Sequence, residues 1–139
     1  MGKINYGRVV LGGVVAGVVL LLMDFVGMQI IGFDWEAWAV ERNLTMPPMA
    51  TWIVMDVLYG ILLVWLYAAI RPRFGPGVRT AVMAAVWGWI FFSITQWAPT
   101  AMGLWPMNTY WMMAAWGLVQ LTAAVVAGAW VYKEDGGQM

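Results

Sequence analysis

The chain has 139 residues, of which 63% are hydrophobic and 10% are charged, and its formal net charge is zero. A soluble domain is nearer half apolar and a quarter charged, so this chain has too few polar side chains to cover a surface in water. It contains neither cysteine nor histidine, which removes thiol chemistry, the commonest metal and haem ligand and the commonest general base. We therefore expect a membrane protein that is not an enzyme and has no cofactor, metal site or catalytic residue. Nucleic acid is also excluded as a partner, because its binding needs a basic surface.

Four apolar segments, at residues 9–31, 50–70, 80–98 and 110–132, are long enough to cross a bilayer, which takes about 20 residues of helix. Helices are required because backbone polar groups in lipid must be satisfied within the segment. Between the first two spans, "FDWEAWAVERN" at 33–43 predicts a short helix with Asp34 as its N-cap, lying in the outer interface of the membrane. The predicted fold is a single all-α domain, a bundle of four transmembrane helices.

The basic residues predict the orientation, because cytoplasmic loops are enriched in Lys and Arg. If the four spans alternate in direction, one side carries most of the positive charge, and the opposite loops carry only Arg42 against three acidic residues. Both termini should then face the cytoplasm, with "KEDGGQM" at 133–139 as a short solvated tail. The residues on the basic side are Lys3, Arg8, Arg71, Arg73, Arg79 and Lys133.

Small residues recur along one face of each predicted helix. In the first span, Gly13 and Gly17 form a GxxxG pair, which allows a second helix to approach closely. The same face carries Asp24, so this carboxyl group is expected to point into the bundle and away from lipid. The glycines predicted to pack between helices are Gly13, Gly17, Gly27, Gly60 and Gly117.

Polar side chains interrupt the apolar runs, and most of them share a face with small residues. Asp24 and Asp56 lie at similar depths on antiparallel helices, so they are expected to meet. An ionised aspartate costs about 2.5–3.5 kcal/mol in mid-bilayer, and neutralising one at pH 7 costs roughly 4 kcal/mol. Because these costs are close, we expect the pair not to be doubly ionised. The candidate intramembrane polar site comprises Asp24, Asp56, Gln96, Gln120 and Tyr59.

Four interpretations of this site compete. In the first, the polar groups join helices, and the protein has a packing or assembly role as a homo-oligomer or as an accessory subunit of a larger membrane complex. In the second, the carboxylates exchange a proton or another ion in a small transporter. The third is an outward-facing pocket for a cationic or lipid-like ligand, and the fourth is an intramembrane enzyme that uses the aspartate pair. In the third interpretation, the walls of the ligand pocket would be Trp52, Trp89 and Trp116.

Three stretches, "YGRVVLGGVVAGVVLLLMDF", "LVWLYAAIRPRFGPGVRTAV" and "WGLVQLTAAVVAGAWVYKE", carry a resemblance that spans nearly the whole chain. They resemble a group of small bacterial four-helix integral membrane proteins of unknown function, and "WLYAAIRPRFGPG" is the most distinctive element. The resemblance implies a multi-pass protein of the bacterial cytoplasmic membrane. It implies no activity.

The orientation can be tested with reporter fusions. A reporter fused after Gly75 and one fused after Gln138 should both report a cytoplasmic location, because the basic residues retain these segments on that side. A periplasmic signal from either fusion would contradict the predicted topology.

Overall fold

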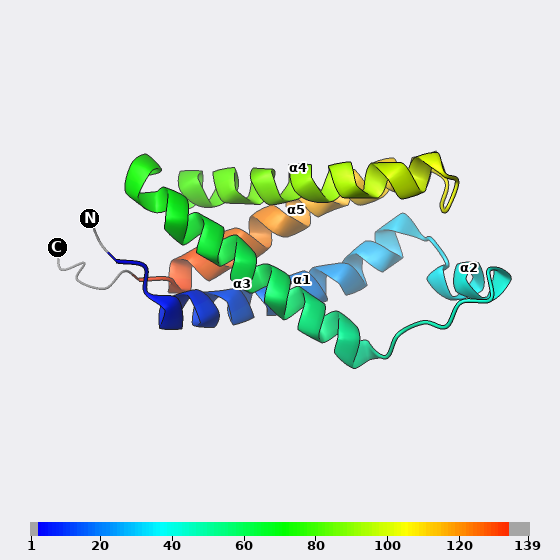
Figure 1. The fold of residues 1–139 in the computed structure, drawn as a ribbon, viewed down its shortest axis with the longest axis horizontal. Helices are drawn as coiled ribbons and strands as arrows, with labels where there is room; N and C mark the ends of the chain where they lie inside the picture. Colours follow the sequence, from blue (N-terminus) through cyan, green and yellow to red (C-terminus); the bar gives the residue numbers. More distant parts are fainter. Residues whose placement is uncertain (1–2, 134–139) are drawn as a thin grey trace.

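The computed structural model describes residues 3–133, and this part of the chain is helical, with no extended sheet (Figure 1). Four helices are long and apolar enough to cross a membrane, which confirms the predicted number of spans. The predicted tail falls, after Lys133, outside the described residues. The helices are α1 (Tyr6–Ile31), α2 (Trp35–Glu41), α3 (Met49–Phe74), α4 (Val78–Ala101) and α5 (Met107–Val131).

Local sequence explains where the helices begin and end. The side chain of Asn5 caps α1 by accepting a hydrogen bond from the backbone N–H of Arg8 at 2.9 Å, and Gly32 ends the helix with a left-handed φ of 65°. Helix α3 continues four residues past its predicted end and contains Pro72. Proline is tolerated there because it removes one backbone bond close to the helix end. Arg71 is therefore helical and does not lie in a loop.

The long helices form a ring in the order α1, α3, α4, α5, in which α3 and α5 also touch across the bundle and α1 and α4 do not. Neighbouring helices run antiparallel (Figure 1). The start of α1, the α3–α4 connection and the end of α5 lie at one end, which we call the basic end because it holds Lys3, Arg8, Arg71, Arg73, Arg79 and Lys133. The backbone N–H of Asn5 donates to the Tyr132 hydroxyl at 3.4 Å and ties α1 to the residue that follows α5.

At the other end, which we call the α2 end, the short helix packs on the α4–α5 connection. Asp34 caps α2 by accepting from the N–H of Ala37 at 2.9 Å, as predicted from the sequence. The indole N–H of Trp38 donates to the carbonyl oxygen of Leu104 at 2.6 Å. The rings of Trp35 and Trp105 meet edge to face at 6.1 Å between centroids. Helix α2 is therefore held by aromatic contacts with a loop.

Glycines let α1 and α3 approach until their backbones touch. A Cβ atom built on Gly17 would lie 2.7 Å from the Cα atom of Val57, closer than side chains pack. A Cβ on Gly13 would likewise collide with the backbone of Ile61, and one on Gly60 would lie 2.6 Å from the backbone nitrogen of Gly17. The two helices therefore interlock through small residues on both sides of the contact.

The other side of α1 makes a similar contact with α5. A Cβ atom on Gly12 would lie 2.6 Å from the carbonyl oxygen of Gly128, and a Cβ on Gly128 would lie 2.7 Å from the carbonyl oxygen of Gly12. Neither Gly12 nor Gly128 is among the packing glycines predicted from the sequence. Helix α1 thus has a small-residue face toward each of two neighbours.

Most of the buried core lies in the half of the bundle nearer the basic end. Val64 and, near the middle of α1, Leu20 are almost wholly buried, together with three alanines on α4 and with Ala124 on α5. Toward the α2 end the packing is looser, and α3 crosses α1 obliquely and diverges from it (Figure 1). Residues 49–55 of α3 are all exposed. The bundle therefore has one tightly packed half and one open half.

Replacing Gly17 with leucine should destabilise the bundle, because the new side chain would collide with backbone atoms of α3 that cannot move aside. We expect a loss of about 1–3 kcal/mol or more in the free energy of unfolding. It can be measured by denaturant titration in mild detergent. Val18→Leu is the matched control, since Val18 follows Gly17 on α1 but is 48% exposed. Equal effects of the two substitutions would contradict the close α1–α3 contact.

Candidate functional site

Three helices bring polar side chains together inside the apolar bundle. Asp24 on α1 and Asp56 on α3 each lie about two turns from the α2 end of their helix. From α5, the side-chain amide of Gln120 donates to Asp24 Oδ1 at 2.5 Å and to the carbonyl oxygen of Leu20 at 3.2 Å. We call Asp24, Asp56 and Gln120 the polar cluster. It connects α1 to both of its neighbours at the point where the bundle begins to open.

Asp56 is the least satisfied member of the polar cluster. Its carboxyl group lies close enough to Asp24 for hydrogen bonding and for repulsion between the two charges. One of its oxygens, Oδ2, is buried but has no hydrogen-bond partner among the described residues. A buried acceptor without a partner loses its hydration without compensation, at about 1–3 kcal/mol. The Asp56 carboxyl group is therefore the position in the cluster with unused hydrogen-bonding capacity.

Tyr59 and Gln96 do not join this cluster. The hydroxyl group of Tyr59 points to the next helix and donates to the carbonyl oxygen of Gly88 on α4 at 3.0 Å. Gln96 also lies on α4, which does not touch α1, and no described residue hydrogen-bonds to its side chain. The sequence places Gln96 at a suitable depth, but depth alone does not determine which helices are neighbours.

Tryptophans close the gaps around the cluster. The indole N–H of Trp116 on α5 donates to the carbonyl oxygen of Met23 at 3.1 Å, and its ring covers Gly27. Trp116 precedes Gln120 by one helical turn, so both face α1. From α4, Trp89 lies over Gly117 and donates to the carbonyl oxygen of Ala114 at 2.7 Å.

These contacts explain one of the predicted packing glycines. A Cβ atom on Gly27 would collide with the Trp116 ring, whereas a Cβ atom on Gly117 would lie 3.8 Å from Trp89, an ordinary van der Waals contact. Trp89 and Trp116 lie between helices, whereas Trp52 is exposed on α3. The three tryptophans proposed as walls of a ligand pocket thus do not face a common space.

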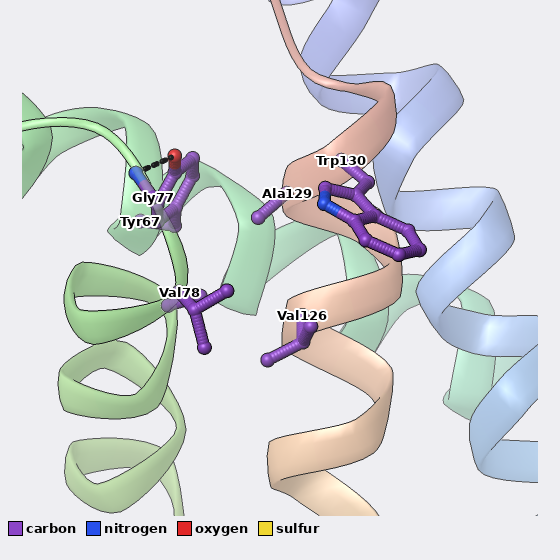
Figure 2. A pocket seen from close by; sticks show the side chains of 7 residues that line it. Tyr67, Gly77, Val78, Val126, Ala129 and Trp130 are labelled. Carbon is purple, nitrogen blue, oxygen red and sulfur yellow. Dashed lines mark hydrogen bonds between the residues drawn. The ribbon is translucent and has the colours of Figure 1, made fainter.

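A small hollow lies elsewhere, at the basic end between α3, α4 and α5 (Figure 2). Its volume is about 60 Å³, and Val78 and Val126 face each other across it. The polar side-chain groups in its lining are the indole N–H of Trp130 and the hydroxyl of Tyr67, which accepts from the N–H of Gly77 at 3.2 Å. A hollow of this size and lining has room for a few waters and few groups to bind them.

The polar cluster offers two carboxyl groups and one amide as possible ligands for an ion. No group of three or more acidic, histidine or cysteine side chains that could hold a metal ion exists within residues 3–133. Chemically, the polar cluster can accept hydrogen bonds, share a proton or attract a single cation.

No known protein family, no protein of established function and no solved structure matches this chain.

The bond between Gln120 and Asp24 can be tested by matched glutamine substitutions. Gln120→Leu should lower the free energy of unfolding by about 1–3 kcal/mol, because it leaves a carboxyl group and a carbonyl oxygen without their donor. Gln96→Leu is the control, since no described residue hydrogen-bonds to that side chain, and it should change stability little. Both can be measured by denaturant titration in mild detergent. A smaller effect for Gln120→Leu than for Gln96→Leu would contradict the assignment.

Proposed function

We propose that this protein has a packing or assembly role within the membrane, as a homo-oligomer or as an accessory subunit of a larger membrane complex, and that it is not an enzyme. The observation that carries this proposal is the Asp56 carboxyl group. Asp56 lies about two turns inside a span and is only partly covered by its own bundle, and its buried Oδ2 has no hydrogen-bond partner among the described residues. Lipid tails offer no hydrogen-bond donor to the part of this residue that remains exposed, whereas a transmembrane helix of another subunit can supply one if the carboxyl group turns toward it.

The shape of the bundle supports the same proposal. The half near the basic end is closed by glycine and alanine contacts within the chain. In the open half, α3 exposes all its residues from Met49 to Met55, immediately before Asp56. A partner helix that packs along this part of α3 would reach Asp56 without disturbing the closed half.

We further propose that the protein lies in the bacterial cytoplasmic membrane with both termini in the cytoplasm and α2 in the outer interface. The supporting observation is the separation of charge along the bundle. The cations other than Arg42 gather at the basic end, as expected for a cytoplasmic face. Asp34, Glu36 and Glu41 lie on or next to α2 at the opposite end.

Single cysteines can test the assembly surface, because the chain has no cysteine of its own. Met55→Cys places a thiol on the open half of α3, where the parent side chain is 57% exposed. When native membranes are treated with benzophenone-maleimide, whose maleimide adds to the thiol and whose benzophenone inserts into a neighbouring C–H bond on irradiation, we expect this variant to crosslink to a second copy or to another subunit. The mass of the adduct, read by denaturing electrophoresis and mass spectrometry, separates these two cases.

Ile94→Cys is the matched control, since Ile94 is 68% exposed on α4 at a similar distance from the α2 end. It should remain uncrosslinked. The assembly role would be wrong if no position on the exposed part of α3 formed an adduct, or if Met55→Cys and Ile94→Cys crosslinked equally.

The polar cluster also favours a second candidate, a small ion- or proton-coupled transporter, because Asp24 and Asp56 form a pair that can share and release a proton. Substitution of Asp56 separates the two functions. Asp56→Asn keeps the hydrogen-bonding capacity, so in an assembly subunit it should preserve folding and partner binding. Asp56→Leu should instead weaken partner binding, because it removes the carboxyl group that the partner is proposed to satisfy, and it should cost the bundle itself little, since Oδ2 has no hydrogen-bond partner there.

In a transporter, Asp56→Asn should fold normally but lose pH- or cation-dependent flux. The flux can be measured in proteoliposomes with an internal pH indicator. A gradient-driven flux in the parent protein that Asp56→Asn abolishes would favour the transporter over the assembly role.

A further inference from the structure

A groove separate from the polar cluster lies at the α2 end. It has a volume of about 450 Å³ and is shallow and widely open. The last turns of α1 contribute Met28 and Gln29, residues 33–36 form the wall that leads into α2, and Met46 closes it from the connection to α3. In Figure 1 this region lies where α1 ends beside α2. None of the interpretations drawn from the sequence uses it.

The groove carries negative charge that nearby residues do not neutralise. Asp34 and Glu36 both line it and both are exposed. Arg42 is the only cation that the structure describes at this end. It lies at the far end of α2, paired with Glu41 at 3.0 Å and placed over the Trp38 ring at 5.2 Å. The two acids in the groove therefore form an anionic rim suited to a cation.

Aromatic rings form the rest of the recognition surface. Phe33 and Trp35 line the groove and meet edge to face at 4.5 Å between centroids. Trp35 is held in turn by Trp38 and Trp105, at 6.0 and 6.1 Å, so its ring is fixed before any ligand arrives. Aromatic faces beside carboxylates are the combination that binds alkylammonium groups, through cation–π attraction and charge.

The position of the groove indicates where that ammonium group comes from. Four helices of this length span the bilayer, so the end of α1 lies at the level of the lipid headgroups. Below the groove, α1 presents apolar side chains such as Phe25 and Val26 on its exposed surface, along which acyl chains can lie. We propose that the groove binds the ammonium headgroup of a zwitterionic phospholipid, with Asp34 and Glu36 facing the charge and Trp35 covering its methylene groups.

The probe lipid is phosphatidylethanolamine, with phosphatidylglycerol of the same acyl chains as the anionic comparison. Both are added to the full-length protein in mild detergent, and the bound lipid is measured by native mass spectrometry. We expect preferential retention of phosphatidylethanolamine. The double variant Asp34→Asn/Glu36→Gln should weaken that binding about tenfold, since it removes both charges. Asparagine still caps α2, so the variant is expected to fold.

Glu41→Gln is the matched control, because it removes one acid from the same helix at a position outside the groove, and it should not alter lipid binding. Glu36→Lys should reverse the preference toward phosphatidylglycerol. Equal retention of both lipids by the parent protein would overturn the proposal, as would equal losses in the double variant and the control. Displacement of the lipid by free ethanolamine at the same concentration would show that the groove takes a soluble ammonium ion and would also overturn it.

Discussion

The close approach of α1 to α3 and α5 is the constraint on which the rest of the structure depends. Gly13 and Gly17 bring the α3 backbone against α1, and Gly12 meets the backbone of Gly128 on α5. In lipid, where there is little hydrophobic drive for one helix to join another, such contacts supply the packing energy. Because the contacts are concentrated in the half near the basic end, they hold that half closed and leave the other half free to diverge.

The polar cluster follows from this geometry. One or two turns beyond the glycine contacts, α1 is still close enough to α5 for Gln120 to reach Asp24. On the other side, α3 is beginning to separate, so Asp56 reaches Asp24 but is not enclosed. The same divergence explains why the Asp24 carboxyl group accepts a hydrogen bond from Gln120, whereas Asp56 Oδ2 has no donor among the described residues. Within a membrane, a carboxyl group like that of Asp56 is typically paired with a partner or used in a function that depends on its charge.

The two ends of the bundle differ in charge and in construction. At the basic end, cations surround closely packed helices, and Tyr132 ties the start of α1 to the end of α5. At the α2 end, a short capped helix rests on a loop through indoles that meet edge to face, with acidic residues around it. The first arrangement suits anchoring at a membrane face, where lysine and arginine set the orientation. The second leaves room for small groups at headgroup depth.

Sequence alone determined the number of long helices, the cap at Asp34 and the pairing of Gly13 with Gly17 on one face, because hydrophobic length, capping chemistry and helical spacing are local properties. It also placed Asp24 and Asp56 at a common depth, since depth follows from position along a span. Only the tertiary structure decided which helices touch. That is why Gln96, at a suitable depth on α4, lies apart from the aspartates, and why the contact between Gly12 and Gly128, which are far apart along the chain, was not foreseen. The order of helices around the bundle depends on side-chain packing summed over whole interfaces, and no single segment encodes it.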